Sequence, residues 1–394
     1  MGCKEERRTG AISIFYIVFI QFAAGVALGA IMYRSDFCMA GAFRDSFLFR
    51  DFVRLRALLL LIALLAFSLY LMRFFRIIST YPPSFFGMPS AASLLGGFLF
   101  GAGMVLGGGC LTSTLYKVGG GSMANAITFC GVLFGGLVSA VLYPFVEVFA
   151  RSTVFFSDKT ALEHLIGSAA DPVVAAFLVI TVLALSWKGR RMRPQSGYAR
   201  GYIAPWKASY MMAFVITVAV VVSGRPLAVN MGFEKLSGIL GAAVLPSVVG
   251  KISYYNIRSP RFLFGGIMNG GAGPVIDSIT ISQLPLMAGI AGGSFVSSLR
   301  FREFRIKRLP PARQVFSAFS GGMLMAVGAF MAGGCNLWHM IGGLPVLALQ
   351  SILFVVGVAG GSYLGTVFLK EQILEGWKKG GVQWKTRLKT SSST

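Results

Sequence analysis

The sequence predicts an all-α protein that crosses a membrane several times, and three observations predict it. Hydrophobic residues make up 55% of the 394 residues, charged residues only 13%, and the mean hydropathy is +0.72, which is too apolar for a soluble core. Several apolar runs approach the length of about 20 residues that a helix needs to cross a bilayer. Basic residues gather in short clusters between these runs and give a net charge of +22. Such clusters are typical of cytoplasmic loops and of contact with anionic lipid, not of a nucleic-acid-binding surface.

One stretch of the chain occurs twice, as LGGFLFGAGMVLGGGCLTSTLYKVGG with Cys110 and as SGGMLMAVGAFMAGGCNLWHMIGG with Cys335. The glycines that open each copy, divide it and precede its cysteine all recur after the same shift of 225 residues. They are Gly96, Gly97, Gly103, Gly108 and Gly109, and then Gly321, Gly322, Gly328, Gly333 and Gly334. The sequence therefore predicts two pseudo-symmetric transmembrane repeats, 11–187 and 208–369, joined by a basic linker, 188–207, and followed by a basic tail, 370–394.

In the first half, the apolar runs 11–33 and 55–72 predict two spanning helices. Between them, RSDFCMAGAFRD (34–45) predicts a helix break or a short helix around Cys38. The apolar run 91–106 covers only about 24 Å at 1.5 Å per residue, against a hydrocarbon core of about 30 Å. It therefore predicts a helix that ends part-way, so that the glycines 107–109 line an enclosed or wet cavity. The runs 123–148 and 173–187 complete this half.

The second half begins after the linker, which has six basic residues and no acidic one and is therefore predicted to be cytoplasmic. Spans are predicted for 208–222, 284–299 and 346–369, and the glycine-rich segment GGIMNGGAGPV from Gly265 predicts an irregular backbone that lines a cavity. The basic segment 300–313 is a second cytoplasmic marker. The tail is expected to be cytoplasmic and partly disordered.

About nine transmembrane helices result, with re-entrant half-helices at the two glycine-cysteine regions. A simple count of spans does not bring the linker, the segment 300–313 and the tail to one side of the membrane, and it leaves the side of the N-terminus open. Short, glycine-interrupted segments at corresponding positions of two halves indicate the binding site of a transporter near the bilayer midplane.

Three cysteines are the candidate residues of a substrate path: Cys38, Cys110 and Cys335. Each stands at a predicted helix break, where free amides and the positive end of a helix favour a thiolate or an anionic ligand. The sequence spacing of Arg34 and Gly41 recurs at Arg225 and Gly232 with Val229 in the place of Cys38, so three thiols rather than four are candidates. Cys130 lies in an apolar run and is interpreted as a packing residue.

A second set of residues is expected to line the cavity beside these thiols. The set comprises Gly108, Gly109, Gly333, Gly334, Asn336 and His339. Because His339 follows Cys335 by four residues, the two share a helix face, and either a metal pair or a polar cavity residue fits that spacing. No full ligand set is visible, so no metal and no cofactor are expected. Thr112 to Thr114 either donate to an anion or cap the helix that resumes there.

Three segments together resemble the YeeE/YedE family of bacterial inner-membrane sulfur transporters: RSDFCMAGAFRD, GGFLFGAGMVLGGGCLTSTLYKVGGG and FMAGGCNLWHMIGGLPVLALQS. The resemblance covers about the first 150 and the last 100 residues. It implies an hourglass-shaped, multi-pass helical transporter and not an enzyme, which imports a small sulfur anion, thiosulfate in the best-understood members. In such transporters the cysteines that match Cys38, Cys110 and Cys335 form a line and pass the anion by thiol hydrogen bonds.

The resemblance also implies a small cytoplasmic sulfur-carrier protein of the TusA type as a partner, and some relatives are associated with selenium. Leu337, Trp338 and His339 differ from the small polar residues expected after the last cysteine in thiosulfate-type members. Two other classes stay open. A thiol-redox enzyme or sulfurtransferase needs a base, for which His339 is the evident candidate. A soft-metal transporter would use the seventeen methionines, most of which lie singly in apolar runs, as packing residues do.

Overall fold

The computed structural model describes residues 2–75, 86–156, 160–162, 180–181, 184–185, 201–224, 226–257, 259–263 and 266–391. Over these residues the chain is helical apart from one antiparallel hairpin. Eight described segments are long and apolar enough to cross a membrane: Ile14–Leu48, Val53–Phe74, Ala91–Gly119, Met123–Ser152, Pro205–Ser223, Ser278–Arg300, Ala312–Ala332 and Leu349–Glu371. The predicted all-α, multi-pass class is confirmed. The ninth predicted span, 173–187, lies almost entirely outside the described residues.

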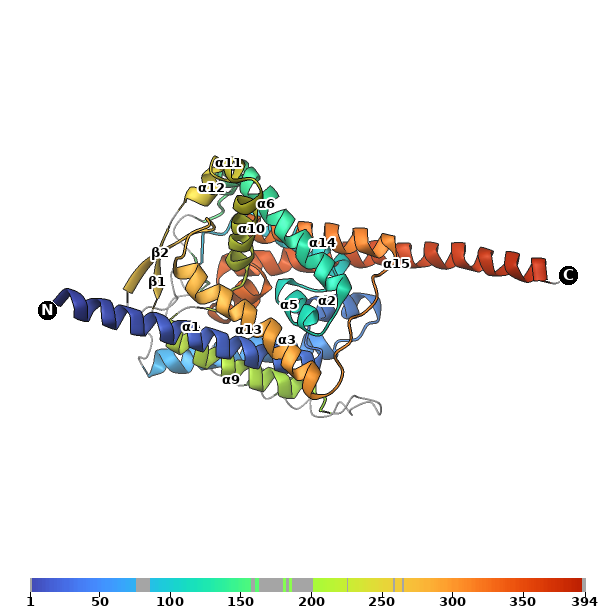
Figure 1. Ribbon diagram of the computed structural model, residues 1–394. Helices are drawn as coiled ribbons and strands as arrows, with labels where there is room; N and C mark the ends of the chain where they lie inside the picture. Colours follow the sequence, from blue (N-terminus) through green and yellow to red (C-terminus); the bar gives the residue numbers. More distant parts are fainter. Residues whose placement is uncertain are drawn as a thin grey trace.

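The elements follow the order that the sequence predicts (Figure 1). They are α1 (Gly2–Ser35), α2 (Met39–Leu48), α3 (Val53–Phe74), α4 (Ala91–Leu106), α5 (Leu111–Gly119), α6 (Met123–Ser152), α9 (Pro205–Ser223), α10 (Asn230–Val244), α11 (Pro246–Val249), α12 (Ser253–Asn256), β1 (Ser259–Leu263), β2 (Gly266–Gly270), α13 (Ser278–Arg300), α14 (Ala312–Ala332), the π-helical turn η2 (Leu337–Gly343), the 3₁₀ turn η3 (Leu344–Val346) and α15 (Leu349–Ser391).

Helices α4 and α14, which carry the repeated glycines, cross each other in antiparallel directions at the centre of the molecule. A Cβ atom at Gly96 would lie 2.6 Å from the carbonyl oxygen of Gly328, and one at Gly103 would lie 2.7 Å from that of Gly321. The backbones are therefore too close for any side chain at these four positions, as in the small-residue interfaces of membrane helices. The glycines of one copy thus face the glycines of the other.

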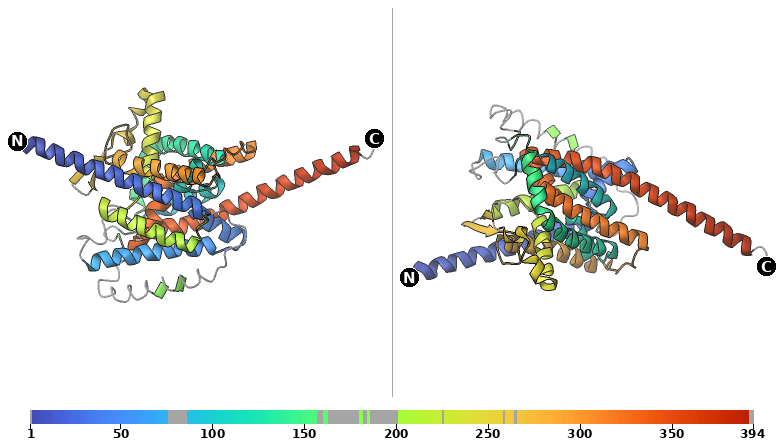
Figure 2. Two further views of the ribbon diagram at one scale, coloured as in Figure 1. Left: turned by 60° about the horizontal axis from the view of Figure 1, so that its bottom comes forward. Right: turned by 90° about the horizontal axis from the view of Figure 1, so that it is seen from above.

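The helices around this pair pack across the two halves of the chain. Helix α6 packs on α14 with Gly131 against Phe319, and α15 packs on α4 with Gly357 against Leu94. Likewise α1 lies along α13, and α9 lies along α3, as the two views of Figure 2 show. The division of the chain into two repeats stays a prediction. In each of these pairs one helix comes from the first half and the other from the second, which is the packing expected of two such repeats.

The basic segments meet at one end of the bundle, which we call the basic end. Arg34, at the end of α1, bonds Glu303 at 2.8 Å, and its carbonyl oxygen accepts from the amide of Ile203 at the end of the linker. The amide of Lys307 bonds the carbonyl oxygen of Gly121. Helix α15 runs parallel to α4 toward the same end, so the tail joins the other basic segments there. The N-terminus lies at the opposite side of the molecule from the C-terminus (Figure 1).

This arrangement resolves the count of spans that the sequence left open. The first described residues of the linker, the segment 300–313 and the tail all lie toward the basic end. Helix α6 ends at the opposite end, whereas α9 begins at the basic end. The span predicted for 173–187 falls between them and lies almost entirely outside the described residues.

Three sequence predictions need correction. The tail forms a continuation of α15 as far as Ser391 instead of a partly disordered segment. The glycine-rich segment after Gly265 begins as strand β2, which pairs with β1, because an extended backbone satisfies its amides through the partner strand; only the residues after Gly270 are irregular. The predicted short span 284–299 belongs to a longer helix, since Asp277 caps α13 at its start and adds a further turn and a half.

We predict that Gly361→Ala destabilises the protein and that Gly360→Ala does not. An added Cβ at Gly361 would lie 1.9 Å from the carbonyl oxygen of Phe98, whereas at Gly360 its nearest neighbour is a ring carbon of Phe98 at 3.6 Å. Overpacking a backbone contact costs about 1–3 kcal/mol, and alanine in open space favours a helix. Thermal unfolding of purified protein in detergent measures the difference; equal melting temperatures of the two variants would refute the close α4–α15 contact.

Candidate functional site

The two central helices end at matching glycine breaks. Helix α4 ends at Leu106, as predicted, and Gly108 follows with φ +73°; α14 ends at Ala332, and Gly333 follows with φ +72°. Residues with a side chain are strained in this left-handed region, so glycine is required at both turns. Each break leads directly into a cysteine, and a new helical segment then starts.

Cys38 and Cys110 each occupy the position that precedes a short helix. Cys38 is the N-cap residue of α2, and its Sγ accepts a hydrogen bond from the amide of Gly41 at 3.3 Å. Cys110 is the N-cap residue of α5. The hydroxyl of Ser113 donates to the carbonyl oxygen of Cys110 at 3.0 Å and lies 3.4 Å from Cys110 Sγ. Ser113 therefore holds the start of α5 at this thiol.

Cys335 lies where two helical segments begin. The backbone amides of Leu337 and Trp338, in the first turn after the cysteine, point to its sulfur, and so do those of Val229 and Asn230 at the start of α10. Val229 is the N-cap residue of α10, as Cys38 is that of α2, so the correspondence predicted from the sequence holds at this position. At the start of α10 the second half therefore has backbone amides near the cysteine, whereas at the start of α2 the first half has the Cys38 thiol.

The three thiols form one buried group. Their exposed fractions are 6% for Cys38 and 1% for both Cys110 and Cys335. Cys110 lies close enough to each of the other two for their charges to interact, which makes it the middle member. Cys130, in contrast, is exposed on the surface of α6 and lies apart from the group.

Lys117 is a member of this site that the sequence reasoning missed. Its Nζ lies 2.6 Å from the carbonyl oxygen of Gly108 and 3.9 Å from Cys38 Sγ. A Cβ atom at Gly109 would lie 2.6 Å from Ser113 Oγ and 3.4 Å from Lys117 Nζ, so both side chains crowd this glycine. One pattern in the sequence was sufficient to find Lys117, because an ionisable residue inside an apolar, membrane-spanning stretch indicates a functional site.

Several buried polar atoms beside the thiols have no hydrogen-bond partner in the described part of the chain. They are Thr112 Oγ1, Thr114 Oγ1, Tyr116 OH, Asn125 Oδ1 and Asn336 Oδ1. Neither threonine caps α5, whose N-cap residue makes no side-chain hydrogen bond. Buried polar groups normally have partners, so this concentration around three thiols is unusual and fits a path for a polar ligand.

His339 is buried and has protein partners at both ring nitrogens. Nε2 lies 3.2 Å from the carbonyl oxygen of Ala332, and Nδ1 lies 2.9 Å from Ser351 Oγ. A carbonyl oxygen only accepts, so Nε2 carries the proton. The ring also stacks on Phe354, with centroids 4.3 Å apart. In this position His339 bonds the last carbonyl of α14 and packs on Phe354. No group of three or more metal-ligating side chains occurs among the described residues.

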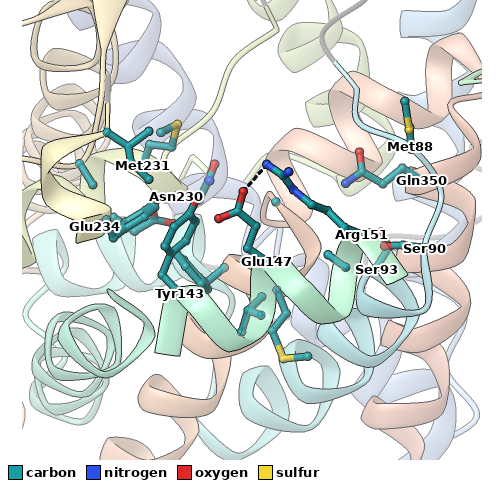
Figure 3. Close-up of a pocket in the computed structure, with 18 of the residues that line it drawn as sticks. Met88, Ser90, Ser93, Tyr143, Glu147, Arg151, Asn230, Met231, Glu234 and Gln350 are labelled. Atoms are coloured by element: carbon teal, nitrogen blue, oxygen red, sulfur yellow. Dashed lines mark hydrogen bonds and ion pairs between the residues drawn. The ribbon is translucent and has the colours of Figure 1, made fainter. Parts of the chain in front are cut away.

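A cavity of about 530 Å³ opens at the end of the bundle opposite the basic end (Figure 3). We call it the vestibule. Its lining comes from the start of α4, the end of α6, the start of α10 and the end of α14, and it includes Gly333 and Asn230. Both residues neighbour Cys335 in the chain or in space, so the vestibule ends next to this thiol. Glu147 and Arg151 form an ion pair across its wall (Figure 3).

Charged groups below the vestibule are paired. Lys235 is fully buried and bonds Asp277 at 2.8 Å and the carbonyl oxygens of Gly271 and Gly273. Burial alone raises the pKa of Asp277, but hydrogen bonds from Lys235 and from the amides of Gly271 and Thr280 outweigh it and lower that pKa from its usual value. The pair is therefore ionised at neutral pH and holds the loop after β2 against α10.

Known proteins match this chain over most of its length. A family model described as "Sulphur transport" matches residues 34–364. The thiosulfate transporter TsuA of Escherichia coli (strain K12) is 24% identical over 375 residues, 91% of this chain and 97% of the relative. TsuA of Spirochaeta thermophila is 25% identical over 349 residues, with 86% and 97% covered. The probable transporter YedE of Salmonella typhimurium is 28% identical over 172 residues, 43% of this chain and 41% of the relative.

We predict that His339→Ala lowers stability without changing transport per folded molecule. The substitution leaves Ser351 and the carbonyl oxygen of Ala332 with one partner fewer and removes the stacking on Phe354, which together cost about 1–3 kcal/mol. Ser351→Ala, which removes only one hydrogen bond, should cost less. Thermal unfolding in detergent and uptake normalised to folded protein measure the two effects; lost uptake at unchanged stability would place His339 on the substrate path.

Proposed function

The chain belongs to the sulphur-transport family, and from that membership we propose that it imports a small sulfur oxyanion through the three thiols Cys38, Cys110 and Cys335. Because two of its relatives are named thiosulfate transporters, thiosulfate is the substrate that we propose first. One observation carries the proposal: three buried thiols belong to one packed cluster, each at the start of a helical segment.

The chemistry of this path suits an anion with a terminal sulfur. Amides at helix starts and free hydroxyls donate to the oxygens, as at other helix N-termini that bind anions. The terminal sulfur is soft and polarisable and meets a thiol of the same kind. Successive weak contacts let the anion enter and leave, which conduction requires, and the anion keeps its covalent bonds throughout.

The charge at the two ends of the molecule supports an orientation for the proposed path. The positive-inside rule assigns the basic end to the cytoplasm, and this assignment leaves the vestibule facing outward. The anion would then pass the vestibule, Cys335, Cys110 and Cys38 in this order. For a bacterial chain this corresponds to the inner membrane, with anionic lipid beside the basic residues.

A cytoplasmic carrier protein of the TusA type is part of the same proposal. The segment 300–313 exposes several basic side chains at the basic end, close to the last thiol of the path. An acidic face on a carrier would be attracted to this surface before receiving the anion.

Two alternatives keep part of this mechanism. A selenium species with a terminal, polarisable selenium would use the same thiols, and competition with labelled thiosulfate distinguishes it. A sulfurtransferase would need a base beside a thiol, and the nitrogens of His339 are engaged by Ser351 and Ala332. Release of sulfite from thiosulfate by the purified protein would favour this second alternative.

We predict that Cys110→Ser and Cys335→Ser each lower thiosulfate uptake at least about tenfold, and that Cys130→Ser does not. Serine keeps the hydrogen-bond donor but lacks the polarisable sulfur. A tenfold loss corresponds to about 1.4 kcal/mol of lost contact energy. Uptake of labelled thiosulfate into proteoliposomes measures the effect, with growth on thiosulfate as the sulfur source as a second test. Wild-type uptake by both buried variants would refute the thiol path.

A further inference from the structure

The polar residues that follow the first cysteine of the repeat have no counterparts after the second. Under the shift of 225 residues, positions that are hydroxyl-bearing or cationic in the first copy become bulky, aromatic or glycine in the second. The pairs are Thr112 and Leu337, Ser113 and Trp338, Thr114 and His339, Tyr116 and Ile341, and Lys117 and Gly342. At a different offset, Cys38 corresponds to Val229, and each precedes a short helix. One side of the central thiol is therefore built for a charged ligand, and the other is not.

Lys117 supplies the cation on that side. No carboxylate lies within ion-pair distance of its ammonium in the part of the chain that the structure describes. Its near neighbours are the carbonyl oxygen of Gly108, the Cys38 sulfur and the backbone of Gly109. A cation inside a membrane-spanning segment is costly unless it is paired, and only one of its three donor hydrogens is used by a carbonyl.

Capping of the broken helix α4 does not explain a charge at this position. The two preceding carbonyl groups of α4 are satisfied by hydroxyls: Ser317 Oγ bonds Leu106 O at 3.2 Å, and Thr128 Oγ1 bonds Gly107 O at 2.9 Å. A neutral donor is therefore sufficient for each orphan carbonyl at this end, and the ammonium of Lys117 exceeds what Gly108 needs.

Tyr116 gives an independent indication of a ligand. Its hydroxyl is buried, has no hydrogen-bond partner in the described residues, and lies within electrostatic range of both Cys38 and Cys110. An unpaired hydroxyl in a dry interior costs about 1–3 kcal/mol, a cost that a ligand oxygen accepting its hydrogen bond would remove.

We propose that Lys117, Ser113 and Tyr116, with the backbone at Gly109, form a binding subsite beside Cys38 for a dianionic sulfur oxyanion. The terminal sulfur contacts the Cys38 thiol, and the oxygens face the ammonium and the two hydroxyls. Glycine is required at position 109, because a Cβ atom there would lie 2.6 Å from Ser113 Oγ and would take the space beside the ammonium and the hydroxyl. The inference rests on the proposed transport function and adds to it the residue that selects for charge.

A cation at this point has a functional consequence. The subsite lies on the side of the basic end, so it attracts the anion after the neutral contacts at Cys335 and Cys110. Two charges on the ligand gain more from Lys117 than one charge does. The subsite therefore favours thiosulfate over a monovalent anion with a terminal sulfur, such as thiocyanate.

The test compares three variants of the full-length protein in detergent. K117Q keeps a donor for the carbonyl of Gly108 and removes the charge, K117R keeps the charge, and K251Q removes the same charge from an exposed turn. Isothermal titration with thiosulfate and with thiocyanate measures the dissociation constants at low salt. Size-exclusion chromatography selects monodisperse preparations, and K117M replaces K117Q if the latter does not fold.

We expect K117Q to weaken thiosulfate binding about 10- to 100-fold, as for a lost charge-assisted contact in a buried site, and to weaken thiocyanate binding less. K117R should stay within about threefold of wild type, and K251Q should be unchanged. Equal binding by K117Q and wild type, or equal losses in K117Q and K117R, would overturn the subsite. Normal uptake by the Cys110 and Cys335 variants would instead refute the thiol path on which it rests.

Discussion

The structure depends on one constraint: a helix that ends inside a membrane protein leaves carbonyl groups that must be satisfied by protein. Helices α4 and α14 both end in this way, at Gly108 and Gly333. Hydroxyls and an ammonium satisfy the carbonyls of α4, and Gln350 and His339 both donate to Ala332 O at the end of α14. The glycine contacts between the two helices bring these ends into a common interior, so the thiols that follow them meet.

The same packing explains why two breaks serve different purposes. In the first half, the break is surrounded by small hydroxyl side chains and a lysine, which leave polar groups available near Cys38. In the second half, Trp338 and the stacked ring of His339 fill the corresponding space, and Trp338 packs on Phe86 with ring centroids 5.0 Å apart. A nearly symmetric backbone therefore supports an asymmetric chemistry, with the apolar side toward the vestibule and the cationic side toward the basic end.

This asymmetry acts against the main electrical cost of the proposed transport. Bringing an anion into a cell that is negative inside costs about 2.3 kcal/mol per charge for each 100 mV. The electrical work of moving the anion grows toward the cytoplasmic end of the path. Fixed positive charge near that end lowers the energy of the anion there. The vestibule needs no such charge, and its Glu147 and Arg151 neutralise each other.

The sequence by itself determined the class, most of the spanning helices and the two breaks, because apolar run lengths and repeated glycines are local properties. It also identified the buried thiols, and it matched Val229 with Cys38 from the spacing of one arginine and one glycine. Only the tertiary structure decided which side chains meet. Lys117 lies at the site because its ammonium reaches from α5 to the carbonyl oxygen of Gly108 at the end of α4. His339 is surrounded by Ser351 and Phe354, which come from a later helix. The common location of the basic segments likewise depends on helix directions, which hydropathy does not encode.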